Sequence, residues 1–98
     1  MNRQVSFHAM AEQELHDAAR YYNALRPGLG QTFLDEAERA VTQIVEYPEA
    51  APLVNRTVRK KLVRRFPYSV MYSIRTEGIR ILAIAHQKRR PFYWRGRR

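Results

Sequence analysis

Apolar residues change their spacing near the middle of the chain, and this change constrains the fold more than any other feature of the sequence. Before Pro48 and Pro52 they recur every three to five positions, as on one face of an amphipathic helix. After these prolines they alternate with polar residues, as in half-buried β-strands. Helical segments followed by a run of strands predict an α+β fold, in which helices pack on a sheet.

Two helices are predicted in the first half. The first covers residues 8–26 with Ser6 as a candidate N-cap, the second covers residues 29–46, and Pro27-Gly28 forms the turn between them. The expected apolar stripes are Met10, Leu15, Ala18, Ala19, Tyr22 and Leu25 in the first helix and Phe33, Ala37, Ala40, Val41 and Ile44 in the second. The residues expected to face solvent are Glu12, Glu14, Asp17, Arg20, Asp35, Glu36, Glu38 and Arg39. The short turn predicts an antiparallel helical hairpin.

Four strands are predicted, one before the helices and three after them. Their ranges are Arg3–Phe7, Thr57–Phe66, Tyr68–Arg75 and Ile79–His86. Turn signals at residues 66–68 and 76–78 keep the connections short, so the last three strands form an antiparallel meander. The predicted architecture is β-α-α-β-β-β, a helical hairpin packed on a small, mainly antiparallel sheet, in one domain over residues 1–98.

Alternation predicts which side chains share a face of the sheet. In the last strand it places Ile79, Ile81, Ala83 and Ala85 on one face and Arg80, Leu82, Ile84 and His86 on the other. In the strand over residues 57–66 it places Val58, Leu62 and Phe66 on one face and Arg59, Lys61, Val63 and Arg65 on the other. Because the last strand is apolar on both faces, we expect it to be the best buried.

Charge divides the chain into two unlike halves. Residues 1–49 contain four basic and eight acidic residues, a balance of −4. Residues 50–98 contain fourteen basic residues and one acid, Glu77, a balance of +13. The second half is therefore expected to meet an anionic partner.

Several classes of protein are excluded by composition. The chain has no cysteine, which excludes disulfides, a thiolate metal site and a cysteine nucleophile. No pattern indicates another metal site or a cofactor. The N-terminus lacks the apolar stretch of a signal peptide, and the longest aliphatic run, residues 81–85, is too short to span a bilayer. We expect a cytoplasmic protein without a membrane partner.

Two stretches then suggest a family. They are AEQELHDAARYYNALRPGLGQTFLDEAERAVTQIVEYPEAAP and, with more specificity, VRKKLVRRFPYSVMYSIRTEGIRILAIAHQKRRPFYW. Together with the order of the elements, they resemble the ParE/RelE superfamily of type II toxins over residues 3–95. The chain is more similar to the ParE-like, plasmid stabilisation branch than to RelE, although it has His8-Ala9 where the family often has Ser/Thr-Pro.

The resemblance implies a growth-arresting toxin that is neutralised by a cognate acidic antitoxin from the same operon. ParE-like members are associated with poisoning DNA gyrase, and this is the implied target. RelE-like members cleave messenger RNA on the ribosome without a metal, which is the alternative. One fold supports both functions, so the fold does not choose between them.

Metal-free RNA cleavage needs a base, an acid and cations around one phosphate. His86 is the only histidine of the basic half, and His86, Arg65 and Arg89 are the catalytic candidates under this alternative. The competing interpretation of His86 is a histidine that packs at the end of a strand. Because proton carriers are scarce in the basic half, binding is favoured over catalysis, and an enzyme would be an mRNA endoribonuclease.

Cations and aromatic residues of the second half are the candidates for contact with the target or the antitoxin. They are Arg59, Lys60, Lys61, Arg64, Arg65, Arg89, Arg90, Tyr93 and Trp94. Residues 91–98 form a basic aromatic C-terminal arm, in which Phe92 and Trp94 are expected to be buried while its arginines face solvent. Arg97 and Arg98 are expected to be mobile. Two other interpretations remain open: cations that protect an edge strand, and aromatic residues that stack on unpaired bases.

Overall fold

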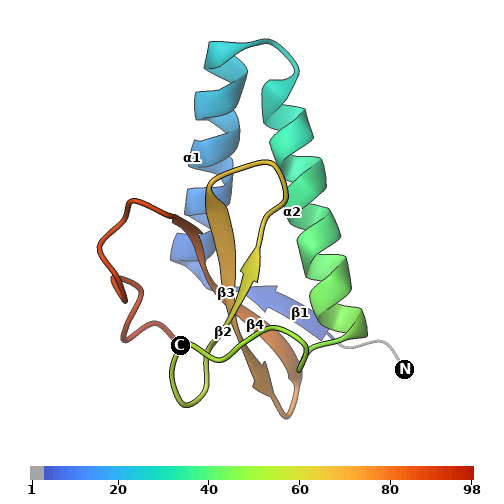
Figure 1. The fold of residues 1–98 in the computed structure, drawn as a ribbon, viewed down its shortest axis with the longest axis vertical. Coiled ribbons are helices and arrows are strands. Elements are labelled where there is room, and N and C mark those ends of the chain that lie inside the picture. The colour runs from blue at the N-terminus through green and yellow to red at the C-terminus, as the bar shows by residue number, and fades with distance from the viewer. Residues whose placement is uncertain (1–3) are drawn as a thin grey trace.

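A hairpin of two helices lies against one face of a four-stranded sheet in the computed structural model, which describes residues 4–98 (Figure 1). The elements are β1 (Gln4–Phe7), α1 (Ala9–Leu25), α2 (Leu29–Glu46), β2 (Arg59–Leu62), β3 (Tyr68–Arg75) and β4 (Gly78–His86). This order confirms the predicted β-α-α-β-β-β architecture. Arg3, the predicted first residue of the first strand, lies outside the described residues.

The strands follow the order β1-β4-β3-β2 across the sheet. β2, β3 and β4 form the predicted antiparallel meander, and β1 joins the other side of β4 in parallel. The sheet is therefore mixed, with β4 in an interior position. As predicted, β4 is the best-buried strand, with Ile79, Ile81 and Ile84 at most 2% exposed.

A β-bulge in β4 overturns the predicted alternation of its side chains. Met71 of β3 pairs with Ala83 and Tyr72 pairs with Ile81, so Leu82 is the extra residue of β4. One extra residue reverses the two faces beyond it. Ile84 consequently packs in the core under the helices, whereas Ala83 joins Leu82 on the opposite face.

The main core lies between the helices and the sheet. It joins small and aromatic residues of the helices to the apolar side chains of β3 and β4. At one end, Tyr22, Phe33, Phe66 and Tyr68 form an aromatic cluster with ring centroids 4.9–6.1 Å apart. Tyr72 is fully buried and donates its hydroxyl hydrogen to the carbonyl of Pro48 at 2.6 Å, which ties the loop after α2 to the sheet.

A second, smaller core covers the face of the sheet that the helices leave free. The C-terminal segment, red in Figure 1, returns past the first turns of α1, and its Trp94 packs with Val58, Met71, Leu82 and Ala83. Trp94 is 5% exposed, as predicted, but Phe92 is 39% exposed. Phe92 was expected in the core, and instead it has a positive φ of 60° and packs beside Trp94 near the surface.

Three details of the helices differ from the sequence predictions. The N-cap of α1 is His8, whose Nδ1 accepts a hydrogen bond from the Met10 N–H, and Ser6 belongs to β1. Met10 and Leu25 belong to the predicted apolar stripe of α1 but are 50% and 62% exposed, whereas Ala11 and Ala18 are the buried residues of this helix. The bounds of α2 agree with the prediction.

The predicted strand over residues 57–66 is shortened to the four residues of β2. Leu62 is 61% exposed because β2 is the edge strand of the sheet. Val58 and Val63 flank β2 and are buried on opposite faces, as the alternation predicts: Val63 packs in the main core, and Val58 packs in the smaller core on the other face of the sheet. The segment before β2 covers part of the edge through a hydrogen bond from the Lys60 N–H to the Pro52 carbonyl.

Candidate binding cleft

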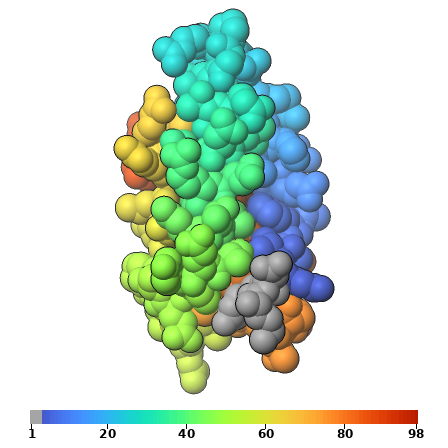
Figure 2. Space-filling model, turned by 90° about the vertical axis from the view of Figure 1, so that its right-hand side faces the viewer, coloured from blue at the N-terminus to red at the C-terminus, as the bar shows by residue number. Residues whose placement is uncertain are grey.

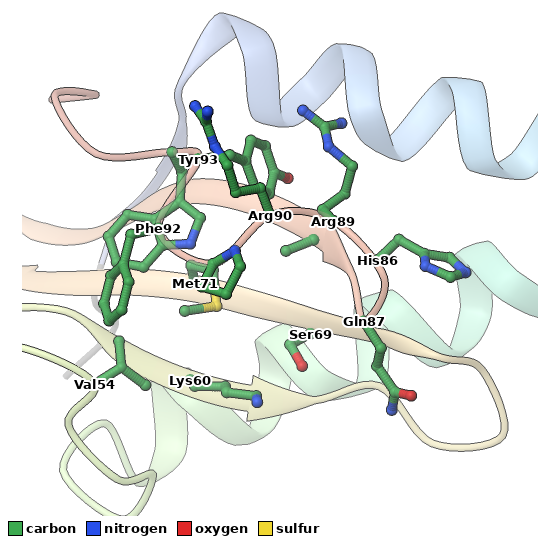
Figure 3. A pocket seen from close by; sticks show the side chains of 13 residues that line it. Val54, Lys60, Ser69, Met71, His86, Gln87, Arg89, Arg90, Phe92 and Tyr93 are labelled. Atoms are coloured by element: carbon green, nitrogen blue, oxygen red, sulfur yellow. The ribbon is translucent and has the colours of Figure 1, made fainter.

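A cleft of about 350 Å³ lies on the helix-free face, between β2 and the segment that follows β4 (Figure 3). Its lining consists of Val54, Lys60, Ser69, Met71, Ala85, His86, Gln87, Arg89, Arg90, Pro91, Phe92, Tyr93 and Trp94. Three cations and no carboxylate belong to this set. The cleft is therefore an electropositive concavity with an apolar floor.

Backbone hydrogen bonds hold the segment after β4 over the sheet. The Gln87 N–H donates to the Pro67 carbonyl, and the Arg89 N–H donates to the His86 carbonyl. The guanidinium of Arg89 lies 3.8 Å from the ring centroid of Tyr93. These contacts fix the position of the segment after β4, which forms the wall of the cleft opposite Lys60 of β2.

Glu14 of α1 holds the C-terminal part of this segment. The prediction that Glu14 faces solvent is wrong, because its side chain is only 13% exposed. Its carboxylate accepts hydrogen bonds from Arg97 and from the hydroxyl of Tyr93 at 2.9 Å. Arg97 is 12% exposed and fixed in this ion pair, which contradicts its expected mobility. Arg98 is also bonded, since its carbonyl accepts two hydrogen bonds from Arg80.

Two groups near the cleft can transfer protons, and both are engaged. The Nδ1 of His86 accepts a hydrogen bond from the Lys88 N–H at 3.0 Å, and its ring packs edge-on against Tyr68. Burial raises the pKa of Tyr93 well above its ordinary value, and the charge and hydrogen bond of Glu14 raise it further. Tyr93 therefore stays a neutral donor to Glu14.

The structure brings two of the three catalytic candidates together. His86 and Arg89 line the cleft, whereas Arg65 is exposed in the turn between β2 and β3, with a φ of 73°, and does not line it. Ser69 and Gln87 belong to the cleft but were not candidates. Their position depends on how the chain returns after β4, which no local pattern indicates.

The binding candidates fall into two groups. Arg59 and the two aromatic residues have structural contacts: Arg59 donates to the carbonyls of Glu49 and Ala51 at 2.9 and 2.7 Å, Tyr93 donates to Glu14, and Trp94 is buried. The second group reaches solvent and consists of Lys60, Lys61, Arg64, Arg65, Arg89 and Arg90, of which Lys61 is half-buried.

Among residues 4–98, no three His, Cys, Asp or Glu side chains group in a way that could hold a metal ion. No helix of that part of the chain has the length and apolarity needed to cross a bilayer.

A helical hairpin on a mixed four-stranded sheet, in the order β-α-α-β-β-β, is the architecture of the ParE/RelE fold. Residues 5–91 match the family described as "ParE toxin of type II toxin-antitoxin system, parDE". The chain therefore belongs to the ParE toxin family and is the toxin component of a type II toxin-antitoxin system.

Among solved structures, the chain is similar to one described as "Chromosomal ParDE TA system from P. aeruginosa". The TM-score is 0.75 at 18% sequence identity, over 86% of this chain and 95% of that chain. At this identity the likeness shows the fold alone, and it agrees with the predicted architecture. No curated protein matches the chain.

Proposed function

We propose that this toxin arrests growth by binding DNA gyrase, and that a cognate acidic antitoxin neutralises it by covering part of its basic half. Membership of the ParE family supports gyrase as the target. The cations of β2, of the following turn and of the segment after β4 that reach solvent are the proposed contact residues. They are Lys60, Lys61, Arg64, Arg65, Arg89 and Arg90.

One observation carries the choice of binding over catalysis: the cleft is rich in cations and poor in free proton carriers. No Asp or Glu lines it, His86 is bonded to the Lys88 N–H, and the hydroxyl of Tyr93 is bonded to Glu14. Acid–base catalysis needs a group within reach of the reacting proton and with a pKa near the working pH. A surface of fixed cations serves recognition without such a group.

The charge balance also supports the antitoxin. A half with a balance of +13 accelerates the encounter with an acidic polypeptide, and buried apolar contacts then slow its dissociation. Leu62 at 61% and Tyr47 at 67% exposure are apolar surfaces that such a partner can cover.

The purified chain tests the target directly in a gyrase supercoiling assay. We expect loss of supercoiling and accumulation of cleaved DNA held by gyrase, and the antitoxin should reverse both effects. In parallel, brief expression of the chain without the antitoxin should arrest growth while transcripts stay intact. Growth arrest with active gyrase in the arrested cells would contradict the proposed target.

A second candidate function is ribosome-dependent cleavage of messenger RNA. The observation that favours it is that Lys60, His86 and Arg89 border one cleft, although the His86 ring is turned away from Lys60 toward Tyr68 (Figure 3). If this function is correct, transcripts are cleaved on expression of the chain, and His86→Ala abolishes the cleavage without loss of folded protein. Intact transcripts in arrested cells would exclude it.

A further inference from the structure

A buried carboxylate with an unfilled hydrogen-bonding site lies in the middle of α2. Glu36 is only 7% exposed, which corrects the prediction that it faces solvent. Its Oε2 accepts one long hydrogen bond from Arg39 Nη1 at 3.4 Å, and its Oε1 accepts none within residues 4–98. An unpaired buried acceptor destabilises the state that contains it, because it loses its hydrogen bonds to water without gaining a partner. The isolated chain thus contains an acceptor that is desolvated but not satisfied.

Glu36 lies at the narrow end of a groove between α2 and β2, which we call the α2–β2 groove. Figure 2 shows α2 in green facing the viewer, with the yellow residues around β2 beside it. A hollow of about 220 Å³ at Glu36 and a wider one of about 700 Å³ near Tyr47 share Gln43, Lys61 and Leu62 in their lining. The exposed side chains of Leu62 and Tyr47 make the groove partly apolar.

The charges around Glu36 restrict what can fill its free site. Arg39, Lys61 and Arg64 line the same hollow, so its local balance is already positive. Another cation would be repelled by these three groups, and a carboxylate would be repelled by Glu36 at short range. An uncharged donor, such as a backbone N–H, an amide or a hydroxyl, satisfies Oε1 without either cost.

We infer that Glu36 is a specificity-determining acceptor for a segment of the cognate antitoxin that lies in the α2–β2 groove. On binding, the Glu36 side chain turns so that its buried Oε1 reaches the groove, where the segment donates an uncharged hydrogen bond to it. The segment also covers Leu62 and Tyr47 with apolar side chains. Its acidic residues meet Lys61 and Arg64. This inference rests on the proposed function, because it takes the antitoxin as the partner.

Charge complementarity selects this occupant over a second copy of the chain. Each copy has a net charge of +9, so a second copy brings like charge toward Lys61 and Arg64. An acidic segment with apolar residues has the opposite charge and matches both parts of the groove. A partner that donates a hydrogen bond to Glu36 therefore binds with higher affinity than a partner that leaves this buried carboxylate without a donor.

The test separates the stability of the chain from its affinity for the partner. The chain is co-expressed with the polypeptide encoded by the adjacent reading frame, separated from it in denaturant and refolded. Glu36→Met is the main variant, because it removes the unsatisfied carboxylate at similar volume. We expect its midpoint of urea denaturation to equal or exceed that of the unchanged chain, and its Kd for the antitoxin to rise at least tenfold.

Two further variants complete the test. Glu36→Gln keeps an acceptor oxygen without the charge, so we expect it to recover most of the affinity that Glu36→Met loses. Glu38→Met is the matched control, since Glu38 is exposed on the same helix and lies outside the groove, and its Kd should be unchanged.

Each contrary outcome has its own meaning. If Glu36→Met lowers the stability of the isolated chain, Glu36 has a structural role and the inference is wrong. If Glu36→Met and Glu38→Met bind the antitoxin equally well, the inference is also wrong. If the unchanged chain itself fails to bind the antitoxin, the proposed function fails first, and the inference fails with it.

Discussion

Glu14 of α1 and Arg97 are 83 residues apart in sequence and form an ion pair with an Nη1–Oε1 distance of 3.0 Å. The pair lies at the edge of β4 beyond the point where β1 ends at Phe7. Glu14 accepts a hydrogen bond from the Ile84 N–H, and Arg97 donates one to the Leu82 carbonyl. Two side chains thus replace the strand that this part of β4 lacks.

Replacing Glu14 should weaken the fold more than replacing any exposed acid. Glu14→Gln leaves the guanidinium of Arg97 buried without its counter-ion. It also replaces one of the two oxygens that accept hydrogen bonds from the Tyr93 hydroxyl and the Ile84 N–H. Breaking a buried ion pair on one side costs about 3 kcal/mol. Urea unfolding followed by the fluorescence of Trp94, the only tryptophan, measures the loss. Glu12→Gln, at an exposed position of the same helix, should change the free energy of unfolding by less than about 0.5 kcal/mol.

Tyr93 should make the chain lose stability in alkali. Burial, followed by the charge and hydrogen bond of Glu14, raises its pKa above the ordinary value of 10.0, and Arg89 and Arg97 oppose this only in part. The folded state therefore binds the tyrosine proton more tightly than the unfolded state does. The resulting stabilisation is complete below pH 10 and is lost as the pH rises above it.

The variant Tyr93→Phe isolates this effect. Because Tyr22, Tyr68 and Tyr72 also have raised pKa values, some alkaline loss remains in the variant. We expect the free energy of unfolding to fall less steeply between pH 9.5 and 11.5 in Tyr93→Phe than in the unchanged chain, on the order of one proton less in the slope. Parallel curves for the two proteins would show that Tyr93 titrates alike in both states.

Much of this fold follows from the spacing of apolar residues. The bounds of α2 and β3 agree with the predicted ranges, because each has one clear apolar periodicity and is closed by proline or by a turn signal. The antiparallel meander follows from the short connections between its strands. These features depend on neighbours in sequence, which a local pattern describes.

The features that local spacing missed depend on distant contacts. The bulge at Leu82 reverses the faces of β4, and one extra residue leaves no mark in a continuous apolar run. A carboxylate on a helix is usually exposed, so the sequence predicts that Glu14 and Glu36 face solvent. Glu14 is buried by the returning C-terminal segment, and Glu36 by the edge of the sheet beside α2. The cleft has the same origin, since two distant segments form its walls.

A small residue is required where the two helices approach each other. A Cβ atom on Gly30 of α2 would collide with the carbonyl oxygen of Ala19 and lie 2.9 Å from the Cβ of Asn23 in α1. Glycine to alanine in an exposed helix interior normally stabilises by about 1 kcal/mol. Here the sign is reversed, and we expect Gly30→Ala to destabilise the chain by about 2 kcal/mol. Thermal unfolding checks this, with Gln31→Ala at an exposed position of the same turn as the control.

If the target binds in the cleft, a cation that lines the cleft should contribute more to affinity than an equal charge elsewhere on the basic half. Lys60 and Lys88 are both exposed lysines of the basic half, but only Lys60 lines the cleft. If the target binds there, Lys60→Ala should raise the Kd for gyrase about threefold to tenfold, as expected for a cation at a wet interface. Lys88→Ala removes the same charge outside the cleft and should change the Kd by less than about twofold. The comparison is made at two salt concentrations, since a weaker salt dependence in Lys60→Ala identifies a lost ionic contact. Equal effects of the two substitutions would mean that the target senses the net charge of the basic half and not the cleft.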